Sequence, residues 1–137
     1  MPVLIEHIDA IARRKQRTVL FLEFHPQPFR EWRNYRYEDD ATRTAVMAWL
    51  DAHGVPWTPC GPFADPRVMA PWLGQVYLDV PWEESLPEYR ELRDYLEHPD
   101  GTVRHAGMRF LAMSLDHAMQ NAAHDGPGFW ERQAEDF

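Results

Sequence analysis

A short segment early in the chain alternates arginine with aromatic residues. Arginine recurs at every third position, as Arg30, Arg33 and Arg36. Trp32 and Tyr35 lie between these arginines. Guanidinium groups neutralise phosphates and stack on bases, and an aromatic ring accepts any base on its face. The segment is therefore a candidate binding surface for single-stranded nucleic acid.

Two other interpretations of segment 29–37 stay open. Its arginines could bind an acidic protein surface, or they could pair with nearby acids while the aromatic rings pack inward. Four acidic residues lie within or just after the segment: Glu31, Glu38, Asp39 and Asp40. The chain has a net charge of −8, which disfavours non-specific binding to nucleic acid. We therefore favour internal pairing.

His25 and Cys60 form the second candidate site, as a base and a nucleophile. An imidazole close to a thiol can generate the reactive thiolate. Each residue follows the carboxyl end of a predicted strand. The two strands run in the same direction, so both residues lie at the same end of the sheet. One strand lies between them in this topology, so the strand ends are about 10 Å apart at roughly 4.8 Å per strand. A direct hydrogen bond needs about 3 Å, so catalysis is the minority interpretation.

The remaining histidines do not have the spacing of a metal site. His117, Asn121 and His124 share one helical face, but two helical turns separate the imidazoles by about 10 Å. No phosphate-binding loop, dinucleotide fingerprint or zinc-protease motif occurs. We expect no metal and no cofactor.

The elements that position these residues follow from hydrophobic periodicity. The almost wholly apolar run 18–24 predicts a central strand that is buried on both faces. Residues 55–58 and 74–80 predict two further strands. Residues 102–124 fit either one long helix or a strand over 108–114 followed by a helix over 115–123. We prefer the second alternative, because Gly107 is a poor residue for a helix interior.

Three segments have the period of amphipathic helices. The first contains Leu4, Ile8 and Ile11 on one face and ends in a basic run over 13–17. A second helix is predicted from a cap at Asp39 or Asp40 to His53, and a third over 86–97. The second helix is predicted to bury Ala45, Trp49 and Ala52, and the third Tyr89, Leu92 and Leu96.

The order of these elements predicts an α+β fold of one domain over residues 1–137. The middle six elements follow the order βαββαβ of the ferredoxin-like split βαβ sandwich, with a helix added at each end. This architecture hosts many unrelated functions and assigns none by itself.

Composition narrows the function class further. The single cysteine excludes an internal disulfide and favours the cytoplasm, and the longest strongly apolar run, 19–22, is far too short to span a membrane. Six Trp and seven Phe are more than a small core easily buries, so we expect an aromatic contact surface. The sequence predicts a non-enzymatic interaction or regulatory module that binds another protein or forms a homodimer.

Overall fold

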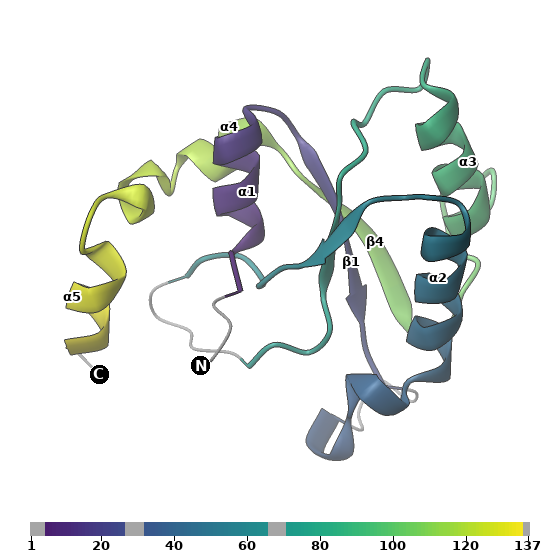
Figure 1. The fold of residues 1–137 in the computed structure, drawn as a ribbon, viewed down its shortest axis with the longest axis horizontal. Coiled ribbons are helices and arrows are strands. Elements are labelled where there is room, and N and C mark those ends of the chain that lie inside the picture. The colour runs from purple at the N-terminus through teal and green to yellow at the C-terminus, as the bar shows by residue number, and fades with distance from the viewer. Residues whose placement is uncertain (1–4, 27–31, 66–70, 136–137) are drawn as a thin grey trace.

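The computed structural model describes residues 5–26, 32–65 and 71–135. Arg30 therefore lies outside the described residues. The described chain is an α+β fold, in which helices pack on both faces of a four-stranded antiparallel sheet (Figure 1).

The sheet has the strand order β2-β3-β1-β4, and every pair of neighbours is antiparallel. Its strands are β1 (Val19–Phe24), β2 (Trp57–Pro59), β3 (Val76–Leu78) and β4 (Met108–Met113). Since β3 lies between β1 and β2 and is antiparallel to both, β1 and β2 run in the same direction. The prediction of a strand followed by a helix in residues 102–124 is confirmed, but the helix ends at Met119 rather than at 123.

The first face of the sheet carries the larger core, beneath α2 (Ala41–Ala52) and α3 (Pro87–Leu96). As predicted, α3 buries Tyr89, Leu92 and Leu96.

The prediction for the buried face of α2 is wrong. This helix buries Val46, Met47 and Leu50 instead, a rotation of about one residue. Trp49 is only half-buried, at the margin of the core, where its ring stacks on Tyr95 of α3 with the ring centroids 4.0 Å apart.

The second face is covered by α1 (Ile8–Lys15) and α4 (Leu115–Met119). Ile5 to His7 are not helical, so α1 begins later than the predicted helical face around Leu4, which itself lies outside the described residues. Beyond α4, the chain forms a 3-10 turn, η3 (Ala122–Asp125), and then α5 (Phe129–Glu135), which projects from the main body (Figure 1). Within the described residues, no helix is both long and apolar enough to cross a lipid bilayer.

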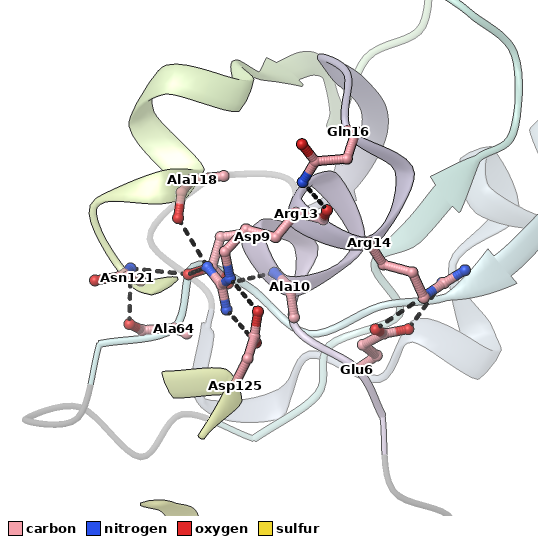
Figure 2. A network of polar contacts seen from close by, with 10 residues as sticks. All are labelled: Glu6, Asp9, Ala10, Arg13, Arg14, Gln16, Ala64, Ala118, Asn121 and Asp125. Carbon is pink, nitrogen blue, oxygen red and sulfur yellow. Dashed lines mark hydrogen bonds and ion pairs between the residues drawn. The ribbon is translucent and has the colours of Figure 1, made fainter. Parts of the chain in front are cut away.

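A buried network of hydrogen bonds and ion pairs connects α1 to α4 and η3 (Figure 2). The Arg13 guanidinium donates to Asp9 at 3.2 Å and to the carbonyl oxygen of Ala118 at 2.8 Å. It also forms a two-pronged pair with Asp125, at 2.7 and 2.8 Å. Asn121 donates to the same Asp9 carboxylate, at 2.8 Å. Arg13 and Asp9 are 5% and 0% exposed, so each charge depends on these partners.

We expect Arg13→Ala to lower the free energy of unfolding by about 3 kcal/mol, because it leaves the buried Asp9 carboxylate without its cation. Arg14→Ala is the matched control: that side chain is 56% exposed, and its pair with Glu6 should contribute less than about 1 kcal/mol. Denaturation in urea measures both variants. Equal losses in the two variants would contradict this role of the network.

Candidate functional site

Tyr35 of the arginine and aromatic segment is turned toward the protein. Its hydroxyl donates to Asp40 at 2.8 Å, and its ring packs against the larger core. Asp40 in turn caps α2 by accepting from the backbone N–H of Arg43 at 3.2 Å. Burial, together with this hydrogen bond to Asp40, raises the pKa of Tyr35 well above its usual value. Tyr35 therefore ties the segment to the start of α2.

Trp32, Arg33 and Arg36 of this segment lie further out. Arg36 pairs with Glu38 at 3.9 Å and with Asp39 at 3.5 Å, as expected for internal pairing. Trp32 is 40% exposed and contacts Tyr35 edge-on, with the ring centroids 5.8 Å apart. Arg33 is exposed. Trp32 is thus exposed while Tyr35 packs inward, so these two rings do not form a continuous stacking surface for bases.

Cys60 lies on the second face of the sheet, at the end of β2, and is fully buried. Burial, reinforced by the nearby carboxylate of Glu23, raises the pKa of its thiol to about 12. The β3 register places Cys60 level with Glu23 of β1, two strands away, and His25 lies two residues beyond Glu23. At about 4.8 Å per strand and 3.4 Å per residue, Cys60 and His25 are separated by roughly 12 Å. The fold therefore does not activate this thiol through His25.

His25 instead lies near the arginine and aromatic segment. His25, Tyr35 and Arg36 line one surface hollow of about 360 Å³ at the start of α2, together with Asp39 and Asp40. In the sequence these residues belong to two separate candidate sites, because local sequence patterns do not predict the path of the chain between β1 and α2. The two carboxylates offset the arginine, so the hollow has no excess of positive charge for a phosphate.

The histidines of the C-terminal region have packing roles. His117 lies against Phe63, with ring centroids 5.1 Å apart, and His124 lies against Phe129 at 4.4 Å. In the part of the chain that the structure describes, no three His, Cys, Asp or Glu side chains are placed to hold a metal ion.

The outer edge of β4 offers backbone hydrogen-bonding groups to a partner. The N–H of His25 donates to the carbonyl oxygen of Gly107 at 2.9 Å, which fixes the phase of the β1–β4 ladder. Hydrogen-bonded and non-bonded residue pairs alternate along an antiparallel ladder. The backbone N–H and C=O groups of Arg109, Leu111 and Met113 therefore point toward β1. The N–H and C=O groups of Met108, Phe110 and Ala112 therefore point away from the sheet. Among the described residues, β4 pairs with β1 alone.

This edge has few of the features that prevent strand addition. Edge strands are usually protected by short length, proline, bulges or charge. The strand β4 has six residues, contains no proline, and keeps an unbroken register from Met113 to Met108. Its only charged residue is Arg109, whose guanidinium forms an ion pair with the carboxylate of Glu23 at 2.6 Å. The opposite edge, β2, has three residues and ends at Pro59.

Local sequence patterns predicted the β4 strand but did not mark its edge as a binding surface. Two features of the sequence could have indicated it. The predicted strand order places the last strand at the margin of the sheet. The segment Met108–Met113 also lacks the proline and the multiple charges that usually protect an edge strand. Comparison with known proteins gives no significant match to a family model, a curated protein or a solved structure.

We expect Tyr35→Phe to lower the free energy of unfolding by about 1 kcal/mol, because it removes the hydrogen bond to the carboxylate that caps α2. Tyr95→Phe is the matched control, because burial alone raises the pKa of Tyr95 and no hydrogen bond of its hydroxyl contributes to that shift. Thermal unfolding of both variants makes the comparison. If Tyr35→Phe has no more effect than the control, the hydroxyl does not anchor the segment.

Cys60 should react with Ellman's reagent only slowly in the folded protein at neutral pH, because the buried thiol keeps its proton. Unfolding in guanidinium chloride should expose it and make the reaction fast. The accelerated rate in denaturant is the internal control. A fast reaction of the native protein at pH 7 would mean that the thiol is activated after all.

Proposed function

We propose that this protein is a non-enzymatic interaction module, which binds an extended strand of a protein partner along the edge of β4 that no described strand occupies. The open edge of β4 carries the proposal. An added strand would satisfy the outward N–H and C=O groups of Phe110 and Ala112, and main-chain pairing of this kind supplies affinity in many complexes. The half-buried side chains of Phe110 and Leu111 would supply apolar contact on either face.

Two further features favour binding over catalysis. The thiol of Cys60 is protonated at neutral pH and distant from His25, which leaves the candidate nucleophile without a base. Arg36 and Tyr35 contact acidic side chains that directly follow their segment, Asp39 and Asp40, which lowers their availability for nucleic acid. The single cysteine, buried and unpaired, supports a cytoplasmic location.

We also infer a ferredoxin-like split βαβ arrangement for the sheet with α2 and α3. The strand order β2-β3-β1-β4, with every neighbour antiparallel, supports this inference. So does the location of α2 and α3, which connect β1 to β2 and β3 to β4 and pack on the same face. In this arrangement β4 is an edge by topology.

Selection of displayed peptides on sparsely immobilised protein tests the proposed binding edge. Ala112→Pro should weaken binding of the enriched peptides about tenfold or more, because proline removes an outward N–H and fills the space beside the edge. The β1–β4 ladder should survive this change, since the N–H of Ala112 does not point to β1.

Ala112→Ser is the matched control, because it keeps the N–H and should bind the same peptides as the unmodified protein. Circular dichroism confirms that both variants fold. Peptides that bind Ala112→Pro as well as the control would refute β4 as the binding edge, and so would the absence of any enrichment by a protein that also stays monomeric.

A further inference from the structure

We propose that the partner of the β4 edge is a second copy of this chain, paired antiparallel about a two-fold axis at Leu111. The inference rests on the function proposed above and identifies its partner. It joins two four-stranded sheets into one continuous sheet of eight strands.

The phase of the β4 ladder restricts the pairing. Only Met108, Phe110 and Ala112 direct their backbone groups outward, so these residues must occupy the hydrogen-bonded pairs of a new ladder. With the axis at Leu111, Phe110 pairs with Ala112 of the partner subunit, and Ala112 pairs with Phe110 of the partner subunit. Each of these two pairs exchanges two N–H···O=C bonds. Leu111 meets its own copy in the closer, non-bonded pair.

Side-chain size supports this register. Phe110 is the largest side chain of the strand, and Ala112, which is exposed, is the smallest. Pairing them places each ring over a small residue, on the face that also carries α2 and α3. On the opposite face, Leu111 contacts Leu111 of the partner subunit. An axis at Phe110 would instead oppose the two rings and set each Leu111 against Arg109 of the partner subunit, which gives poorer apolar contact.

Charge also favours a second copy over a charged peptide. The chain carries a net charge of −8, which disfavours self-association in general. The β4 seam is an exception, because Arg109 is its only charged residue and Glu23 neutralises it within the same chain. Two such edges meet without like-charge repulsion between unpaired groups, and neither offers a free charge to select an acidic or basic peptide.

Sedimentation equilibrium at concentrations from about 1 to 200 µM tests the pairing. The unmodified protein and Ala112→Ser should shift from a monomer of 16.2 kDa toward twice that mass. Ala112→Pro should remain monomeric over the same range, or dimerise at least tenfold more weakly, because one N–H of each bonded pair is lost. A protein that stays at 16.2 kDa at every concentration overturns the second copy as partner.

Cross-linking tests the register. Leu111→Cys should form an intermolecular disulfide rapidly under mild oxidation, because a non-bonded antiparallel pair holds its Cα atoms about 4.5 Å apart. Ala112→Cys is the matched control and should cross-link much more slowly, since it pairs with Phe110 of the partner subunit. The unmodified protein controls for Cys60, which is buried. A dimer in which Leu111→Cys cross-links no faster than Ala112→Cys overturns the Leu111 axis.

These outcomes separate the two proposals. A monomeric protein that still binds selected peptides through β4 refutes the second copy and leaves the interaction module standing. A monomeric protein whose edge binds no peptide refutes both. Dimers that Ala112→Pro does not weaken place self-association elsewhere on the molecule and overturn pairing through β4.

Discussion

The strand β1 has to be buried on both of its faces, and the rest of the fold follows from that requirement. Five of its six residues are buried, so apolar side chains point to both sides of the sheet. Leu20, Leu22 and Phe24 contribute to the core beneath α2 and α3, whereas Val19 and Phe21 contribute to the core beneath α1 and α4. One strand with two apolar faces therefore demands two helical layers.

The two layers are held in different ways. The helices α2 and α3, of twelve and ten residues, cover the larger core mainly by apolar packing. The helices α1 and α4 have only eight and five residues, and they cover a smaller core. Arg13 compensates for this, because it joins α1 to the Ala118 carbonyl of α4 and to Asp125 in η3. A buried guanidinium needs nearly all of these partners, so the network also fixes one arrangement of the C-terminal elements.

The position of β1 inside the sheet has a consequence for function. Since β1 takes β3 and β4 as its two neighbours, β4 has no second neighbour among the described strands. Its alternating backbone groups then remain for a partner, while Cys60 lies beneath the second layer, where its thiol stays protonated. The same topology that buries the only cysteine leaves one edge of β4 without a neighbour among the described strands. The proposed binding through β4 and the protonated thiol of Cys60 therefore have a common structural origin.

Local patterns in the sequence determined most of the elements. The apolar run of β1, the cap at Asp40 and the buried face of α3 are all set by residues that are neighbours along the chain, so the sequence sufficed to predict them. The same holds for the strand and helix that follow Gly107.

Only the tertiary structure decided which residues meet across long separations. Arg13 and Asp125 are 112 positions apart, and neither position signals the other. The predicted face of α2 differed from the real one because the helix rotates to place Val46 and Leu50 over the sheet and to stack Trp49 on Tyr95. His25 approaches Tyr35 and Arg36 rather than Cys60 because strand register, not sequence distance, sets the level of each residue in the sheet. The reason is the same in each case: periodicity encodes which side chains are apolar, whereas packing selects their partners.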